Sequence, residues 1–209
     1  MKSQFLSIPS CILILFFLSS NYIFCQKKNN NILIIDNTKS MIGFNGSKDI
    51  WKNVKDYIIQ FVDTDVRIGE EVTVYTFATK LSSPITFAVN SKKDKELVKN
   101  YINSLEASGL TTCIANALEN SIADLHKNRD NYILLFTDGN ENCTSDFNSL
   151  KSQYNIHKSD VKDIYFIPFN PSVLSYEKEL NIHKTNPNIK HLHVKKPTVP
   201  KKTFNIEIK

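Results

Sequence analysis

The chain has 209 residues, of which 26 are Lys or Arg and 21 are Asp or Glu, so its formal net charge at pH 7 is +5. This excess is mild, and the lysines are scattered except near the C-terminus. A nucleic-acid-binding protein concentrates basic charge on one face, so the composition argues against a nucleic-acid partner. A hydrophobic content of 41% and this length suit one domain with a sizeable core.

The first 25 residues have the features of a secretory signal peptide. Lys2 supplies a positive charge, and residues 11–18 (CILILFFL) form an apolar run of eight residues, whereas a membrane span needs about 20. Cleavage after Cys25 would leave Gln26 as the first residue of the mature chain. We therefore expect a secreted, periplasmic or cell-surface protein without a transmembrane segment after cleavage. Lipid attachment at Cys25 is the alternative, although the bulky Phe24 stands where lipoprotein signals usually carry a small residue.

Strand-like and helix-like segments alternate along the mature chain. The first strand is expected at residues 32–35 (ILII), an all-apolar run typical of a central strand covered on both faces. The next segment predicts a helix, because its apolar residues follow the spacing of one helical stripe: Trp51, Val54, Ile58, Phe61 and Val62. Residues 72–78 and 84–89 are rich in β-branched and aromatic side chains and predict two strands.

The second half of the chain continues this alternation. Two amphipathic helices are expected, the first with Leu97, Val98, Tyr101, Ile102 and Leu105 and the second with Ile114, Ala117, Leu118, Ile122 and Leu125. Strands at 132–137 and 164–169, a short helix at 173–184 and a last strand at 189–194 follow. The pattern predicts an α/β fold with a doubly wound, mostly parallel sheet flanked by helices. We place a short N-terminal extension at 26–30, one domain at 31–194 and a Pro/Lys-rich tail at 195–209.

Three polar clusters lie where ligands bind in such folds, beyond the carboxyl ends of the strands. The first strand runs into Asp36, Thr38 and Ser40. Residues 109–112 (GLTT) open a helix, and the strand at 132–137 runs into Asp138. Carboxylate, hydroxyl and water oxygens are the ligands that a hard cation such as magnesium prefers. Two carboxylates would leave a divalent cation with net positive charge and an exchangeable position, which a partner's Asp or Glu could fill.

These residues and their order resemble the von Willebrand factor type A (VWA) domain with a metal-ion-dependent adhesion site. The signature of that family is Asp-x-Ser-x-Ser after the first strand, a Thr at a Gly-rich helix start, and Asp-Gly after a later strand. Thr38 replaces the usual first Ser and retains its hydroxyl group. The resemblance covers residues 31–194 and implies a Rossmann-like fold. It also implies a divalent cation, magnesium with manganese or calcium as alternatives, held by Asp36, Thr38, Ser40, Thr112 and Asp138.

The position of the threonine ligand leaves one alternative open. Members of the family place an apolar helix residue six positions after this threonine. Leu118 meets that condition for Thr112, and Thr111 is the alternative ligand.

The resemblance implies a binding module without catalytic activity. Its partner would be a protein or extracellular-matrix ligand that presents an Asp or Glu carboxylate to the metal, in adhesion or another protein–protein interaction. One alternative is a metal-independent scaffold with the same fold. Another is a magnesium-dependent enzyme that uses Asp36, similar to the haloacid dehalogenase-like phosphatases. Those enzymes need a second Asp two residues further on as general acid, and this chain has Thr38 there.

Cys113 and Cys143 are the two cysteines that remain after signal cleavage. Both lie near the expected metal edge, so a disulfide between them would tie two site loops together, and two separate thiols are the alternative. Glu141 is interpreted as a solvated loop charge. His191 and His193 alternate on the predicted last strand and are interpreted as surface residues, because the sequence places no third zinc ligand near them.

Overall fold

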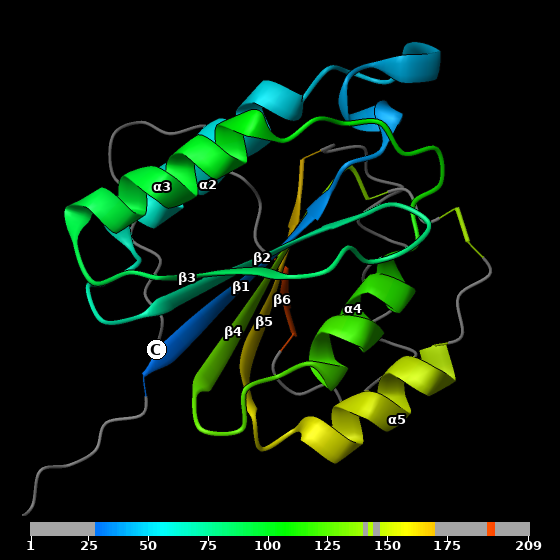
Figure 1. Cartoon of the computed structure of the whole chain (residues 1–209). Helices are drawn as coiled ribbons and strands as arrows, with labels where there is room; N and C mark the ends of the chain where they lie inside the picture. The colour runs from blue at the N-terminus through cyan, green and yellow to red at the C-terminus, as the bar shows by residue number, and fades with distance from the viewer. Residues whose placement is uncertain (1–27, 140–141, 144–146, 170–191, 195–209) are drawn as a thin grey trace, which may run out of the picture.

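The computed structural model describes residues 28–139, 142–143, 147–169 and 192–194. Within these ranges the chain forms a six-stranded sheet with the strand order β3-β2-β1-β4-β5-β6 (Figure 1). β2 and β3 are antiparallel, and every other neighbouring pair is parallel. The strands are β1 (Asn29–Asp36), β2 (Glu71–Phe77), β3 (Ile85–Ala88), β4 (Asp130–Thr137), β5 (Val161–Pro168) and β6 (Leu192–Val194).

Helices cover both faces of the sheet, which confirms the predicted doubly wound α/β fold. Figure 1 shows α2 (Trp51–Thr64) and α3 (Lys92–Ser104) on one face, and α4 (Ile114–Ala123) and α5 (Phe147–His157) on the other. Two short 3₁₀ helices, η1 (Lys39–Met41) and η2 (Phe44–Gly46), follow β1. The parallel strands β1, β2 and β4 therefore end at one edge of the sheet, where the loops after β1 and β4 and the loop before α4 meet.

The central strands are apolar throughout because both of their faces are buried. In β1, Leu33 and Ile35 belong to the core layer beneath α2 and α3, whereas Ile32 and Ile34 belong to the layer beneath α4 and α5. All four side chains are at most 2% exposed. This explains why the run shows no alternation of polar and apolar residues in the sequence.

The predicted helices and strands are present where the structure describes them, with small differences at their ends. β1 begins at Asn29, so residues 29 and 30, which the sequence assigned to an N-terminal extension, belong to the sheet. Leu97 is 50% exposed, and α3 buries Val98 and Ile102 instead. Leu105 and Leu125 follow the last turns of their helices.

One helix was not predicted from the sequence. α5 buries Leu150 and Tyr154, which lie one helical turn apart on a helix made mostly of polar residues. Such a short apolar stripe gives a weak periodic signal.

Several predictions fall outside the described residues: the signal peptide at 1–25, the helix at 173–184, residues 189–191 of the last strand and the tail at 195–209. The part of the chain that is described contains no helix long and apolar enough to cross a membrane.

Candidate metal site

Asp36 ends β1 with a side chain that is 0% exposed, and hydroxyl groups surround its carboxylate. The Thr38 hydroxyl donates to Asp36 Oδ1 at 2.7 Å, and the Thr38 backbone N–H donates to the same oxygen at 3.0 Å. The Ser40 hydroxyl lies 2.8 Å from the Thr38 hydroxyl. Since Thr38 uses its single hydroxyl proton on Asp36, Ser40 is the donor in this second bond. The first cluster predicted from the sequence is therefore one hydrogen-bonded chain.

Thr112 joins this chain from the loop before α4. It is 0% exposed, and its hydroxyl donates to the Thr38 hydroxyl oxygen at 3.3 Å, across 74 positions of sequence. The structure thus brings Thr112, and not Thr111, into hydrogen-bonding contact with the cluster around Asp36. Whether Thr112 ligates a metal stays a prediction.

The end of β4 completes the cluster, and it contains a residue to which the sequence analysis gave no role. The Thr137 hydroxyl donates to Asp36 Oδ2 at 2.6 Å, and it accepts the backbone N–H of Gly139 at 3.1 Å. Asp138 follows, 3% exposed and near enough that its charge acts on Asp36. The register places Ile35 opposite Phe136, so the next residues, Asp36 and Thr137, lie side by side where the strands end. The sequence signals Thr137 only through its place before Asp138.

A network of backbone hydrogen bonds holds the three loops together. The carbonyl of Asn37 accepts the N–H groups of Ser108 and Gly109 at 2.8 and 3.0 Å, and the Gly109 carbonyl accepts the N–H of Lys39 at 2.7 Å. Gly109 is required at this crossing, because an added Cβ would clash with the Cβ of Ala78 at the end of β2. The loop before α4 is therefore packed against both the β1 loop and the β2 end, and this packing positions the site hydroxyls.

Cys113 and Cys143 form a disulfide with a Cα–Cα distance of 5.2 Å, which confirms the predicted pairing. The bond connects the residue after Thr112 to the segment that follows β4. A hydrogen bond from the Asn142 N–H to the Thr112 carbonyl, 2.9 Å long, reinforces the same connection. Two of the site loops are thus joined covalently beside the hydroxyl cluster.

Burial dominates the electrostatics of the site. It raises the pKa of the Asp36 carboxyl from 3.8 to about 6, against the hydrogen bonds from Thr137 and Thr38, which lower it. The negative charge of Asp138 raises the pKa further. Within the described residues Asp36 forms no salt bridge, and the nearby Lys39 instead places its ammonium group 5.6 Å from the ring centroid of Phe44.

The donor set fits a hard divalent cation. It consists of two carboxylates and three hydroxyl groups, all oxygen, gathered from three loops at the carboxyl edge of the sheet. A buried carboxylate next to a second one is stabilised in its ionised form by a cation. Within the described residues no three His, Cys, Asp or Glu side chains form a metal-binding group, so a cation here would depend on the hydroxyl ligands. Glu141 and His191 lie outside the described residues, as does the side chain of His193.

The fold and this oxygen-rich edge define a doubly wound α/β domain with a candidate cation site beyond its parallel strands. The sequence model of the von Willebrand factor type A domain family matches residues 32–141, slightly more than half of the chain. The chain belongs to this family. Comparison with curated protein sequences gives no significant match.

Solved structures with the same fold include three whose sequence identity is low. The von Willebrand factor type A protein of Catenulispora acidiphila is 14% identical with a TM-score of 0.58, over 82% of this chain and 39% of that one. The PilB minor pilin of Streptococcus sanguinis is 11% identical with a TM-score of 0.63, over 85% and 59%. Proximal thread matrix protein 1 of the mussel byssus, with a zinc-occupied MIDAS motif, is 18% identical with a TM-score of 0.55, over 82% and 44%. This chain covers less than two thirds of each of these proteins, and the likeness shows the fold alone.

Proposed function

We propose that this chain is an exported VWA-domain protein that binds a partner protein through a divalent cation. Asp36, Thr38, Ser40, Thr112 and Asp138 would hold the cation, magnesium in the first instance. The partner would be a protein or matrix ligand that presents an Asp or Glu carboxylate. No catalytic step is part of the proposal.

The hydrogen-bonded chain around Asp36 carries this proposal. Its side chains come from three separate segments of the chain, and the bonds run from Thr112 through Thr38 to the carboxylate. A hydroxyl can turn its proton outward and offer a lone pair to a cation, which an amide N–H group cannot do. When bound, a divalent cation would supply a positively charged position that accepts a partner's carboxylate. The chain's own contribution is to hold these oxygens in place through the backbone bonds between Asn37, Lys39 and Gly109.

Two observations support export. The Cys113–Cys143 disulfide is of the kind that persists in oxidising compartments, where secreted and periplasmic proteins fold. The sequence of residues 1–25 has the charge and apolar run of a signal peptide. The mussel byssus protein and the streptococcal pilin carry the same fold, which suits an extracellular binding role for this chain.

The phosphatase-like alternative has less support. A nucleophilic carboxylate must reach its substrate, whereas Asp36 is 0% exposed and accepts hydroxyl protons on both oxygens. The position two residues further on is Thr38, which cannot serve as the carboxylic general acid. Assay of the mature protein with a generic phosphomonoester and magnesium tests this alternative, and we expect no turnover.

The proposal is tested by calorimetric titration of the mature, oxidised protein with magnesium, manganese and calcium. We expect the wild type to bind at least one of these cations. Asp36→Ala should lower the affinity by about 100-fold or more, which exceeds the 10- to 100-fold loss that is typical when a residue supporting a metal ligand is changed. Asp56→Asn is the matched control, because Asp56 is an exposed carboxylate paired with Lys52 on α2. Equal affinities in wild type and Asp36→Ala would leave the metal-independent scaffold as the explanation.

The carboxylate requirement is tested separately. The partner should be retained from the native surface or medium in the presence of the cation and released by a chelator. Free acetate at high concentration should compete with it, because it offers the same group. A partner that stays bound in the chelator would contradict a metal-dependent contact.

A further inference from the structure

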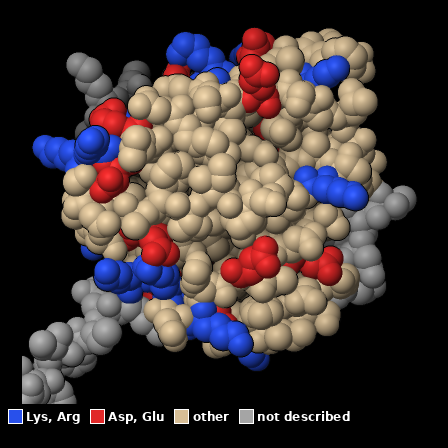
Figure 2. All heavy atoms as spheres, viewed as in Figure 1, with Lys and Arg blue, Asp and Glu red and all other residues tan. Residues whose placement is uncertain are grey.

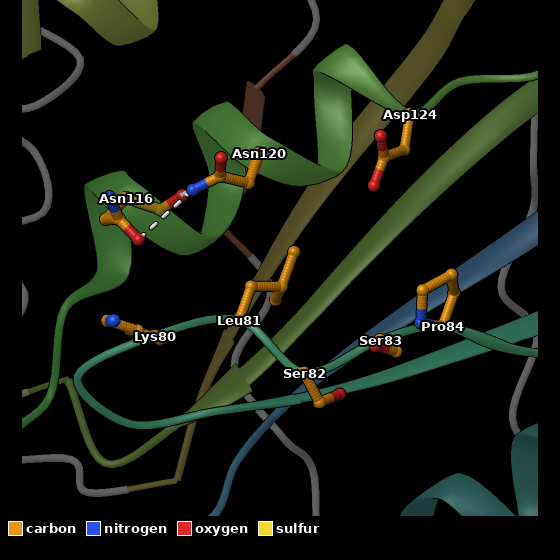
Figure 3. Close-up of a pocket in the computed structure, with 8 residues that line it drawn as sticks. All are labelled: Lys80, Leu81, Ser82, Ser83, Pro84, Asn116, Asn120 and Asp124. Atoms are coloured by element: carbon orange, nitrogen blue, oxygen red, sulfur yellow. Dashed lines mark hydrogen bonds between the residues drawn. The ribbon is translucent and has the colours of Figure 1, made fainter.

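A second polar site lies beside α4, outside the proposed metal ligands. It is a pocket of about 480 Å³ between α4 and the loop that joins β2 to β3, and we call it the α4 groove (Figure 3). One wall comes from residues 80–84 of the β2–β3 loop. The other wall is the side of α4 that carries Asn116, Asn120 and, just beyond its end, Asp124.

The α4 wall presents hydrogen-bonding groups at a regular spacing. Asn116, Asn120 and Asp124 are four positions apart, so they lie along one side of the helix, as Figure 3 shows. Asn120 Nδ2 donates to the carbonyl and Oδ1 of Asn116 at 2.8 and 3.1 Å. Asn116 Nδ2 and Asn120 Oδ1 form no hydrogen bond within the described part of the chain. The pair therefore offers one donor and one acceptor to a ligand, the combination that a peptide unit requires.

The spacing matches that of an extended polypeptide. Four residues of an α-helix rise about 6 Å, and two residues of an extended chain span about 6.6 Å. Alternate residues of a peptide lying along α4 would thus meet Asn116, Asn120 and Asp124 in turn. The facing wall includes Ser83 and Ser82, and the Ser82 hydroxyl oxygen accepts the backbone N–H of Thr76 at 2.9 Å.

The two ends of the α4 groove carry opposite charges. Figure 3 shows Lys80 near the Asn116 end and Asp124 at the opposite end. Burial and the charge of the nearby Asp124 raise the pKa of Tyr75 to about 12, so Tyr75 lies close to this carboxylate. Asn116 and Asp124 are eight positions apart, which corresponds to about 12 Å of helical rise or about four residues of extended chain.

The surroundings favour a peptide over a sugar. None of the eight described residues that line the groove is aromatic, so no ring is available to stack on the apolar face of a sugar. On the face of the molecule that carries β3, Figure 2 shows a centre made mostly of uncharged residues, with charged groups around it.

We propose that the α4 groove binds an extended peptide that places an acidic residue at Lys80 and a basic residue, about four positions away, at Asp124. Its backbone bonds to Asn116 and Asn120. This contact does not depend on the metal, so it stands or fails separately from the proposed function.

The test is selection of a displayed library of random dodecapeptides on the mature, oxidised protein in the presence of a chelator. We expect the selected peptides to share an acidic and a basic residue about four positions apart. Synthetic copies should lose affinity at least tenfold in fluorescence-polarisation measurements with Asn120→Ala or with Asp124→Lys. Exchange of the peptide's basic residue for Glu should restore binding to Asp124→Lys, and N-methylation of the central peptide bonds should abolish binding.

The controls use positions outside the groove. Asp56→Lys changes an exposed carboxylate on α2 and should leave the peptide affinity unchanged. Thermal unfolding of each variant shows that the fold is retained. The proposal is overturned if no peptide is enriched, or if the selected peptides bind wild type and both groove variants equally. The proposal is also overturned, in favour of a sugar ligand, if the wild type binds glycans on an array but no peptide and the groove variants lose this glycan binding.

Discussion

The polar clusters at the two ends of the central strands are similarly buried but use different donors. At the amino end, Glu70 is 9% exposed and accepts the side-chain amides of Asn29 and Asn31 at 2.7 and 3.1 Å. At the carboxyl end, Asp36 accepts hydroxyl groups instead. Amide N–H groups act only as donors to an anion, because they have no lone pair to offer a cation. A hydroxyl group can either donate its proton to an anion or offer a lone pair to a cation.

Other amide side chains at the amino end form a hydrogen-bonded network. Asn30 Nδ2 donates to Asn131 Oδ1 at 3.0 Å. Asn131 Nδ2 in turn donates to the carbonyls of His126 and Asp160 at 2.9 and 2.8 Å. These bonds hold the strand ends in place. Burial of polar side chains does not by itself distinguish a candidate cation site, whereas the type of donor around the buried carboxylate does separate the two ends of the strands.

The largest expected effect concerns the disulfide beside the carboxyl ends of the strands. The double variant Cys113→Ser/Cys143→Ser should lose about 2–4 kcal/mol of unfolding free energy, because the bond closes a loop across 30 positions. Urea denaturation measures this loss, and reduced wild type should match the variant. Two free thiols in the mass of the unreduced wild type would contradict the bond itself.

The second prediction compares the two carboxylates directly in a chelator. The folded-state pKa of Asp36, about 6, lies above its ordinary 3.8, so this group's contribution to stability is fully present below pH 3.8 and is lost as the pH rises through about 6. Asp36→Asn removes that cost and should stabilise the metal-free domain at pH 7.5 by up to about 3 kcal/mol. Glu70→Gln should destabilise it by about 1–3 kcal/mol, because the new amide faces the donors of Asn29 and Asn31.

Chemical denaturation at pH 4 and pH 7.5 measures both variants. The gain in Asp36→Asn should disappear at the lower pH, where the wild-type carboxyl is protonated. A destabilised Asp36→Asn at pH 7.5 would mean that the two ends hold their carboxylates in the same way.

The third prediction tests how the loops are packed at the carboxyl edge. Gly109→Ala should cost about 1–3 kcal/mol, because its Cβ clashes with Ala78 and pushes the loop before α4 away from Asn37. The same displacement should weaken magnesium binding, as calorimetry would show. Gly69→Ala is the control for this clash: its added Cβ meets no atom within 4 Å, although its positive φ of 96° adds backbone strain. Unchanged metal affinity in Gly109→Ala would show that the site does not depend on this crossing.

The smallest effects come from single hydroxyl groups. Thr137→Val and Thr73→Val each remove a hydroxyl that donates to a buried acceptor, Asp36 in one case and Asn30 in the other. Each should cost about 1 kcal/mol of stability. Only Thr137→Val should also change magnesium affinity, by about tenfold, because Thr137 orients a proposed ligand. Equal metal affinities in the two variants would remove the distinction between the ends.

The sequence predicts the fold well where apolar periodicity is strong. The run at residues 32–35 and the stripe from Trp51 to Val62 lead directly to β1 and α2. The helix α5 was missed, because Leu150 and Tyr154 are its only described buried apolar side chains. Tertiary packing against α4, rather than a periodic pattern, decides that segment.

The sequence predicts the motif of the candidate site, but it does not predict the strand register that brings the other side chains to it. Asp36, Thr38 and Ser40 are neighbours in the chain, so their bonds follow from local geometry. Thr137 reaches Asp36 only because β4 pairs with β1 in a particular register, and a single sequence does not contain that register. The hydrogen-bond network at the amino end was not predicted for the same reason, since it links β1 to residues about 40 and 100 positions away.

The Cys113–Cys143 bond also has a consequence for how the protein responds to proteolysis. The ring that it closes contains all of α4 and β4, including the exposed turn at Lys127 and Asn128. Exposed turns of this kind are preferred sites of proteolytic cleavage. A protease that cuts there opens the backbone and leaves one covalent molecule, with Thr112 and Asp138 still on segments joined beside the site. A nicked protein should therefore run as two fragments only after reduction, and the segments that carry the proposed cation ligands should stay joined until then.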